Sequence, residues 1–300
     1  FFQNDSGYFT KANIMAFGGA NFPSDGLEFS LHGDINSDGY PDLLVVSNDD
    51  SRLFQNRWAS GASGFEDVFG DFPRSIQLLF EDATCGAWVD WDHDGDQDLL
   101  LGRGETNGIG GDRTASPDYI LVNRGVPSTW ATIEVAGQNL ISNAMTVLDF
   151  DRDGYNELFV GTVEESGGLH IYKETELGGV KEFTASIPGN AGQKEITNLS
   201  WVDVNGDGWF DLVLELKNFG VEILINDHSG GFSSSLPVGY GKAKNFGFLD
   251  FNADGWKDLV CYDTNAPSPN VLLMNTGGIP GFESGFVDVS LPSGVGVASD

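Results

Sequence analysis

The sequence predicts an all-β protein, a β-propeller of four-stranded blades with calcium-binding loops between the first and second strands. The main observation is an acidic pattern, D-x-[DN]-x-D-G-x-x-[DE], which begins at Asp34, Asp90, Asp149, Asp203 and Asp250. The copies are spaced 56, 59, 54 and 47 residues apart, and short apolar segments flank each one. Repeats of this length are typical of arrays in which each unit buries its apolar surface against its neighbours.

Four short strands are expected in each repeat. An apolar strand precedes the loop, and a second strand follows it directly as LLVVS, LLLG, LFVG, LVLEL or LVCY. Such continuous apolar runs are typical of strands covered on both faces. A third strand usually ends in asparagine, at Asn56, Asn123, Asn226 and Asn275, whereas the third repeat ends at Lys173. A Gly-rich turn then leads to a fourth strand with an aromatic residue, namely Phe65, Trp130, Phe183, Phe232 or Phe286. This order indicates a propeller blade.

The repeats predict one β-propeller domain over residues 1–300 that is a fragment of a longer protein. The expected divisions are a partial blade at 1–20, repeats at about 21–72, 73–135, 136–188, 189–236 and 237–290, and the start of a further blade at 291–300. The first ten residues match a third strand, a turn and a fourth strand, and Asp300 falls where the next loop should begin. The alternative is a pair of degenerate terminal blades that resemble the motif.

The loop residues are suited to bind Ca²⁺. Side-chain oxygens at positions 1, 3, 5 and 9 and the backbone carbonyl at position 7 would surround one centre, and the glycine at position 6 permits the sharp turn. Hard oxygen ligands favour Ca²⁺ over zinc or copper. The sequence therefore predicts about five structural calcium sites. Their ligands are Asp34, Asn36, Asp38, Tyr40 and Asp42; Asp90, Asp92, Asp94, Asp96 and Asp98; Asp149, Asp151, Asp153, Tyr155 and Glu157; Asp203, Asn205, Asp207, Trp209 and Asp211; and Asp250, Asn252, Asp254, Trp256 and Asp258.

These loops are not EF-hands. An EF-hand needs a bidentate glutamate at position 12 and flanking helices. Position 12 here is apolar in every copy and lies in a predicted strand, at Val45, Leu101, Val160, Leu214 and Cys261. In the third loop Glu157 replaces aspartate, and its longer side chain could chelate bidentately or distort the site.

Two other loop positions have a regular chemistry. Position 2 is always apolar, at Ile35, Trp91, Phe150, Val204 and Phe251, and is expected to fill the core beneath the ion. Position 7 is mostly aromatic, which indicates packing against the adjacent blade or a set of sugar-binding platforms.

Composition excludes several classes of partner and activity. The net charge of −30 disfavours nucleic acids and anionic membrane surfaces, and no run of 18 apolar residues is present. No catalytic motif occurs, so the chain is not expected to be an enzyme. Cys85 and Cys261 are expected to be buried free thiols rather than a disulfide. Asn4 and Asn198 lie in sequons that would make the protein a glycoprotein.

One irregular segment, residues 102–118, lies between a second and a third strand. It contains Arg103 and Arg113, which are unusual in so acidic a chain. The segment is either a solvated insertion or a contact site for an anionic or glycan partner.

The loops, with FGGA at residues 17–20 and the LFQN…G…F pattern, resemble the FG-GAP repeats of integrin α-subunit propellers and the related VCBS repeats. The resemblance implies a calcium-stabilised propeller, usually of seven blades, although six also fit the chain. It further implies an extracellular, secreted or cell-surface location. Members of this kind include adhesion modules, lectins and appendages of larger enzymes or fibres, and the fold does not choose among them.

We therefore expect an extracellular recognition or adhesion module that binds protein or glycan. A structural building block of a surface fibre or large assembly is the first alternative, for which self-association or further domains of the same chain would be partners. An accessory domain of a larger secreted enzyme is the second alternative.

Overall fold

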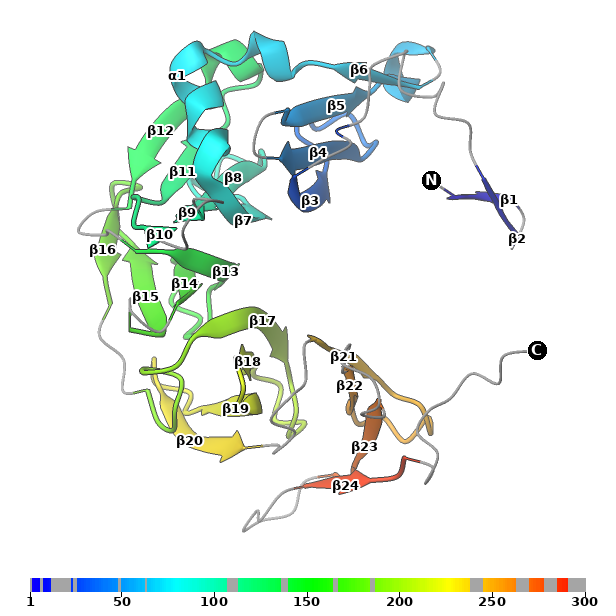
Figure 1. Ribbon diagram of the computed structural model, residues 1–300, viewed down its shortest axis with the longest axis vertical. Coiled ribbons are helices and arrows are strands. Elements are labelled where there is room, and N and C mark those ends of the chain that lie inside the picture. Colours follow the sequence, from blue (N-terminus) through cyan, green and yellow to red (C-terminus); the bar gives the residue numbers. More distant parts are fainter. Residues whose placement is uncertain are drawn as a thin grey trace. The chain divides into compact units, whose positions relative to one another are not determined.

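The computed structural model describes residues 2–5, 8–11, 23, 26–47, 50–62, 64–106, 113–135, 140–163, 167–183, 187–237, 245–262, 270–277 and 285–290. Within these ranges the chain forms five four-stranded antiparallel sheets (Figure 1). Each sheet is a meander in which strands adjacent in the sequence pair with each other, so the expected all-β fold is confirmed.

The five sheets follow one another along the chain. The first sheet consists of β3 (Leu27–Gly33), β4 (Asp42–Ser47), β5 (Arg52–Asn56) and β6 (Phe65–Asp67). The second consists of β7 (Ala83–Val89), β8 (Asp98–Arg103), β11 (Tyr119–Val122) and β12 (Ala131–Glu134). The third consists of β13 (Ser142–Leu148), β14 (Glu157–Thr162), β15 (Leu169–Glu174) and β16 (Val180–Glu182). The fourth consists of β17 (Ile196–Val202), β18 (Asp211–Leu216), β19 (Gly220–Asn226) and β20 (Phe232–Pro237). The fifth consists of β21 (Asn245–Leu249), β22 (Asp258–Tyr262), β23 (Val271–Asn275) and β24 (Phe286–Asp288).

The chain divides into two compact units. Residues 1–141 with 177–180 form the first, and residues 142–176 with 181–300 form the second. The apolar second strands lie at the centre of both cores, because every residue of β8, β14 and β18 is buried. In the first unit Leu44 and Leu99 pack in one cluster, and in the second Phe159 and Leu212 do so.

A helical segment between β6 and β7 was not predicted from the sequence. It consists of the 3-10 helix η3 (Phe69–Asp71), the single turn α1 (Arg74–Gln77) and the 3-10 helix η4 (Leu78–Asp82). Phe72, Ile76 and Phe80 are buried and join the core of the first unit. Two further 3-10 turns are η2 (Trp58–Ser60) and η5 (Pro127–Thr129). None of the helices in the described ranges has the length and apolar character needed to cross a bilayer.

The remaining strands form two small hairpins. The N-terminal strands β1 (Phe2–Asp5) and β2 (Tyr8–Lys11) pair antiparallel, as the strand–turn–strand pattern predicts. The pair β9 (Glu105–Thr106) and β10 (Arg113–Thr114) lies in the irregular segment of the second repeat. Cys85 and Cys261 are both buried and free, which confirms the prediction. FGGA at 17–20 and Asp300 lie outside the described residues.

Candidate metal loops and an adjoining pocket

All five acidic loops have the same backbone conformation. Each joins the first strand of a sheet to the second, and its positions 4 and 6 both have positive φ. Position 6 is always glycine, with φ from 84° to 94°. Position 4 is Ser37, His93, Arg152, Gly206 or Ala253, with φ from 55° to 69°. A left-handed conformation at a non-glycine residue costs about 1–2 kcal/mol, so its recurrence indicates that the fold holds these loops in one shape. This left-handed conformation could not be predicted from the sequence, since the residue type at position 4 varies.

The position-9 carboxylate, at the start of the second strand, is bonded to the loop that precedes it and to the end of the third strand. Asp98 is fully buried; its Oδ2 accepts a hydrogen bond from the backbone N–H of Trp91 at 2.7 Å, and its Oδ1 accepts one from Asn123 at 2.7 Å. The same pair of bonds recurs at Asp42, Asp211 and Asp258. Position 9 is therefore structural as well as a candidate ligand.

Burial of these acids is costly when no cation is near them. The pKa of Asp42, Asp98 and Asp211 is raised to about 6, mainly by burial and to a smaller extent by neighbouring loop aspartates, while backbone hydrogen bonds oppose the shift. A divalent cation in the loop would favour the charged carboxylates and offset this cost.

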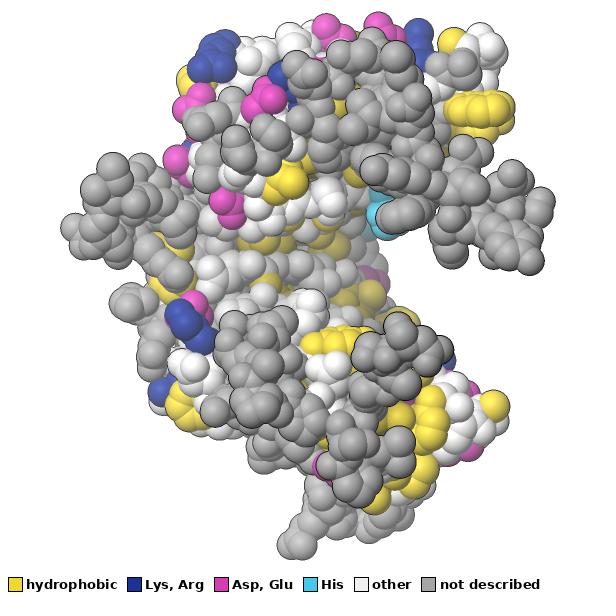
Figure 2. All heavy atoms as spheres, turned by 45° about the vertical axis from the view of Figure 1, so that its right-hand side comes forward, with side chains coloured by type: hydrophobic (Ala, Val, Ile, Leu, Met, Phe, Trp, Pro, Cys, Tyr) yellow, Lys and Arg dark blue, Asp and Glu magenta, His cyan; other side chains and the backbone are white. Residues whose placement is uncertain are grey.

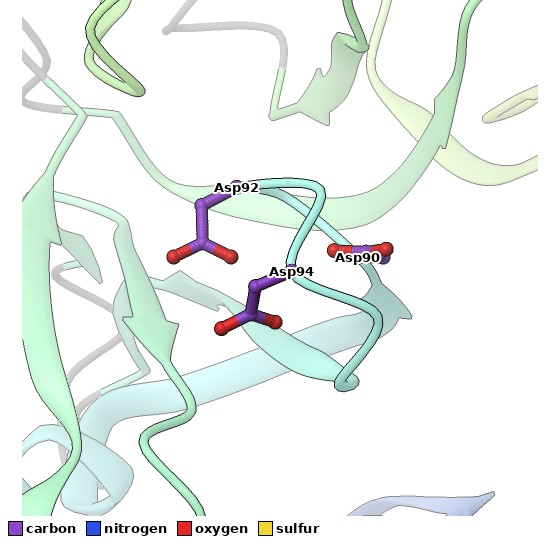
Figure 3. Close-up of side chains that lie close together, drawn as sticks. All are labelled: Asp90, Asp92 and Asp94. Carbon is purple, nitrogen blue, oxygen red and sulfur yellow. The ribbon is translucent and has the colours of Figure 1, made fainter.

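Three carboxylates lie close enough together to hold a metal in the second loop and, with Asp149, Asp151 and Glu157, in the third. The carboxylate oxygens of Asp90, Asp92 and Asp94 lie within 4.8 Å of one another, in the loop that joins β7 to β8 (Figure 3). Two oxygens that bind one Ca²⁺ at about 2.4 Å each can lie no farther apart than that. The arrangement fits a calcium ion. Arg124 contacts Asp92 at 2.8 Å from the outer side, where about half of its side chain is exposed.

The first, third, fourth and fifth loops share one pattern of hydrogen bonds, which the third forms at 149–155 with Asp151 at position 3. In the fourth, Asp203 accepts bonds from the backbone N–H groups of Asp207 and Gly208, and Asp207 accepts one from that of Trp209. Asn205 lies at position 3, and its side-chain oxygen accepts a bond from the N–H of Asp207. The first and fifth loops repeat these bonds at 34–40 and 250–256. These bonds hold the side-chain oxygens of positions 1, 3 and 5 close to the loop backbone, and their role as calcium ligands stays a prediction.

The third loop differs because a lysine lies among its acids. Lys173 Nζ lies 2.9 Å from Asp151 Oδ2 and 2.8 Å from Asp153 Oδ2, and it also contacts Glu157 Oε1. The third strand of this repeat was expected to end at Lys173, where the other repeats have asparagine, and this prediction is wrong. Lys173 pairs with Glu157 across β14 and β15, so Glu174 occupies the asparagine position.

The asparagines that end the third strands connect neighbouring repeats within each unit. Asn123 Nδ2 donates to the carbonyl of Ile35 in the preceding loop at 2.7 Å and to the carbonyl of Gln97 in its own loop at 3.2 Å. Asn226 bonds in the same way to Phe150 and Phe210, and Asn275 to Val204 and Lys257. The sequence showed these asparagines but not their partners, which lie 71 to 88 residues away.

Position 2 fills the core in four of the five loops. Ile35, Trp91, Phe150 and Val204 are buried, as predicted. Phe251 is 43% exposed, which contradicts the prediction for the fifth loop. Ile35, Phe150 and Val204 each lie beneath a following repeat that bonds to their carbonyl, whereas no repeat after the fifth is among the described residues.

Position 7 packs on position 4 of the preceding loop. Asp96 accepts a hydrogen bond from Ser37 at 2.9 Å, and the guanidinium of Arg152 lies 4.0 Å from the ring centre of Trp209. The ring of Trp256 packs so closely on Gly206 that a Cβ added there would lie 2.6 Å from it. Trp209 and Trp256 therefore pack against the preceding repeat, which is one of the two roles expected for position 7.

Position 12 lies in the second strand of every sheet, as predicted when the EF-hand was rejected. Val45, Leu101, Val160, Leu214 and Cys261 are all buried residues of second strands, so none of them is a ligand.

A pocket opens between the fourth and fifth sheets, both of which belong to the second unit. Its volume is about 640 Å³. Four aromatic side chains, two carboxylates and one ammonium line it, namely Trp201, Phe210, Phe248 and Trp256 with Asp203, Asp254 and Lys257. The buried Nε1 of Trp201 has no acceptor among the described residues. The pocket therefore offers apolar faces together with polar groups of both signs, and sequence reasoning did not find it because its lining comes from two repeats.

The other candidate residues have different environments. Arg103 is buried; its guanidinium pairs with Asp82 at 2.8 Å and donates to the carbonyls of Leu79 and Pro117. These bonds occupy Arg103 in holding the irregular segment, so it is not available as the ligand contact that the sequence suggested. Arg113 lies in β10 and Asn4 in β1, and the structure describes only their backbones. Asn198 lies in β17, and its Nδ2 donates to Asn245 at 3.0 Å.

Comparisons with known proteins agree with the loop geometry. The model of the FG-GAP-like repeat matches residues 34–101 and 149–214. No curated protein matches the chain in sequence. Among solved structures, a lectin from Agrocybe aegerita that recognises non-reducing terminal N-acetylglucosamine aligns with a TM-score of 0.61 and 16% identity, over 92% of this chain and 70% of the lectin. BBS1N, solved in complex with ARL6DN, aligns with a TM-score of 0.38 and 13% identity, over 79% of this chain and 77% of that one.

The alignment with the lectin is a likeness of fold. Each of the two matches to the repeat model begins at the first aspartate of an acidic loop and ends in the second strand of the next repeat. The chain therefore carries FG-GAP-like repeats.

Proposed function

We propose that this chain is an extracellular recognition module, a calcium-stabilised β-propeller that binds a glycan in the pocket between its fourth and fifth sheets. The observation that carries the proposal is the lining of that pocket. Aromatic faces stack on the apolar face of a sugar ring, and carboxylates accept hydrogen bonds from its hydroxyl groups. A concave site with a few polar groups among aromatic side chains is typical of small-ligand binding.

Two features support the choice of a glycan over other small ligands. The lectin that aligns with most of this chain binds a sugar, although a likeness of that extent concerns the fold. The pocket also presents two indole rings, Trp201 and Trp256, and the Trp201 N–H could donate to a ligand oxygen. Neither feature requires a catalytic group, so the proposal includes no reaction.

Calcium would hold the polar side of this pocket in place. Asp203 and Asp254 belong to the fourth and fifth loops, at positions 1 and 5. Ions bound in these loops would fix both carboxylates and the ring of Trp256 relative to each other. The ligands proposed for calcium are those of the loops, whose oxygens suit a hard cation.

The charge of the chain restricts the glycan. The net charge of −30 disfavours sialylated or sulfated partners as it does nucleic acids. On the face in Figure 2 the Lys and Arg side chains are scattered singly and do not form a basic patch. We therefore propose a neutral glycan, and an extracellular location in which calcium is abundant.

A binding assay with matched tryptophan variants tests the proposal. The wild type is applied to immobilised neutral glycans, including one that ends in N-acetylglucosamine, with Ca²⁺ present. Trp256→Ala should lower the affinity at least about tenfold, because an aromatic face of the pocket is lost. Trp58→Ala is the control, since Trp58 is 60% exposed in η2 and belongs to the other unit. Absence of binding to every neutral glycan at high density, or equal binding by Trp256→Ala, would contradict the proposal.

A further inference from the structure

The third acidic loop contains its own cation. The ammonium of Lys173 contacts the carboxylates at positions 3, 5 and 9 of this loop, at 2.9 Å from Asp151, at 2.8 Å from Asp153 and in close contact with Glu157. Its side chain is only 11% exposed, and Glu157 is fully buried. The carboxylate oxygens of Asp149, Asp151 and Glu157 lie within 4.8 Å of one another, as a metal site requires, but the ammonium already contacts two of these three acids. With the ammonium in place the loop does not fit a calcium ion, which would need the same oxygens.

The contact is specific to this repeat. In the other repeats the residue before the asparagine is Gln55, Val122, Ile225 or Met274, and none of these carries a positive charge. The third repeat is also the one with glutamate at position 9. The two departures form one cross-strand pair, because Glu157 and Lys173 are partners in the β14–β15 ladder.

The hydrogen bonds of the third sheet are rearranged around this pair. Elsewhere one position-9 oxygen accepts the backbone N–H of the third-strand asparagine. In the third sheet Glu157 Oε2 keeps the bond to the N–H of Phe150, at 3.2 Å, while Oε1 contacts Lys173. The N–H of Glu174 bonds instead to the carbonyl of Asn156 at 2.9 Å. The extra methylene of glutamate brings its carboxylate to the ammonium without loss of the bond to position 2.

Arg124 in the second repeat shows how an ordinary surface cation differs. It contacts Asp92 at 2.8 Å and Asp94 at 3.7 Å, but its side chain is 48% exposed, and its ion pairs within the described residues are with these two acids rather than with Asp98. Lys173 contacts the buried acid at position 9, and its Nζ lies 5.5 Å from the ring centre of Phe183. A long aliphatic stem that ends in an ammonium can fill such a site.

We propose that Lys173 takes the place of the calcium ion in the third loop, so that this loop is stabilised by an internal ammonium and binds no calcium. The proposal rests on the proposed calcium sites in the other four loops. It predicts that the chain binds about four calcium ions, one fewer than its five acidic loops. The repeat that departs from the motif would then remain ordered when calcium is removed.

Calcium stoichiometry of the intact chain, measured by native mass spectrometry, tests this proposal. Asp207→Asn and Asp153→Asn change the same position in the fourth and third loops. The first should lose one calcium, and the second should lose none. Lys173→Met removes the ammonium and keeps an unbranched side chain, so this variant should bind one more calcium than the wild type. The double variant Lys173→Met with Glu157→Asp should also bind one more. The proposal would be overturned if the Asp153→Asn variant bound one calcium fewer than the wild type, or if the Lys173→Met variant bound no more than the wild type.

A melting experiment separates this proposal from the calcium sites themselves. In excess chelator Lys173→Met should melt at a lower temperature than the wild type, because its carboxylates then face one another without a cation. Added Ca²⁺ should restore the variant. If no variant binds calcium, the proposed calcium sites are wrong, and a lower melting temperature of Lys173→Met in chelator still supports the ammonium. Equal melting of the two proteins in chelator would overturn it.

Discussion

At the residue scale, Glu215 shows what burial does to a single acid in this protein. It lies in β18 and is 4% exposed. Burial raises the pKa of its carboxyl to about 7 from the usual 4.5, although a hydrogen bond with Thr197 opposes the shift. Because the pKa is raised in the folded state, the neutral acid stabilises the fold below about pH 4.5, and this contribution is lost as the pH rises through 7.

Glu215→Gln should therefore stabilise the protein at pH 8 and have little effect at pH 5. The neutral amide has nearly the same shape and avoids a buried charge, a difference of at most about 3 kcal/mol in unfolding free energy. Denaturant unfolding of variant and wild type at both pH values, in saturating Ca²⁺, measures it. Glu28→Gln, at an exposed position, serves as control. The same difference from the wild type at pH 5 and pH 8 would contradict the assigned cause.

Single residues also show what the sequence could and could not predict. The acidic loops between first and second strands followed from the spacing of the aspartates, and their residues stay predicted calcium ligands. The place of the Lys173 ammonium did not follow from the sequence, because strand register decides that it faces Glu157, and a one-residue shift would turn it away. The structural use of Arg103 was missed because its partner Asp82 lies in the helical segment before β7, which the sequence did not predict.

At the scale of elements, the third strand of one repeat is joined to the loop of the repeat before it by a buried asparagine. Asn123 is fully buried and donates both of its amide hydrogens to backbone carbonyls, at Ile35 and Gln97. A buried carbonyl that loses its donor costs about 1–3 kcal/mol.

Asn123→Asp should destabilise the first unit by about 2–4 kcal/mol, because it removes both donors and turns a carboxylate toward two carbonyl oxygens. Thermal unfolding of the variant measures the loss. Asn218→Asp is the matched control, since Asn218 is exposed at a φ of 65° that aspartate also tolerates. The interpretation of Asn123 as a connection between repeats is wrong if both variants melt with the wild type.

Most elements could be predicted from the sequence, and the exception has a physical reason. The second strands were found because their apolar runs are buried on both faces. The helical segment at 69–82 was not found, because its helices are three to five residues long and too short to show a helical period. Its phenylalanines were recognisable only as apolar residues without a pattern.

At the scale of the whole molecule, the proposed calcium sites would make the stability of the chain depend on calcium. With a net charge of −30, the folded chain concentrates carboxylates beside buried strands. Without cations, folding brings these carboxylates together beside the buried strands, which costs several kcal/mol in unfolding free energy. Calcium bound only by the folded state would stabilise it by about 2.7 kcal/mol per site at a hundred times the dissociation constant.

The most direct test of the account is the melting temperature of the wild type in saturating Ca²⁺ and in excess chelator, with Mg²⁺ as control. We predict that chelation lowers the melting temperature by about 10 °C or more, since several sites contribute, and that Ca²⁺ but not Mg²⁺ restores it. The same melting temperature in calcium and in chelator would contradict the proposal that the acidic loops are calcium sites.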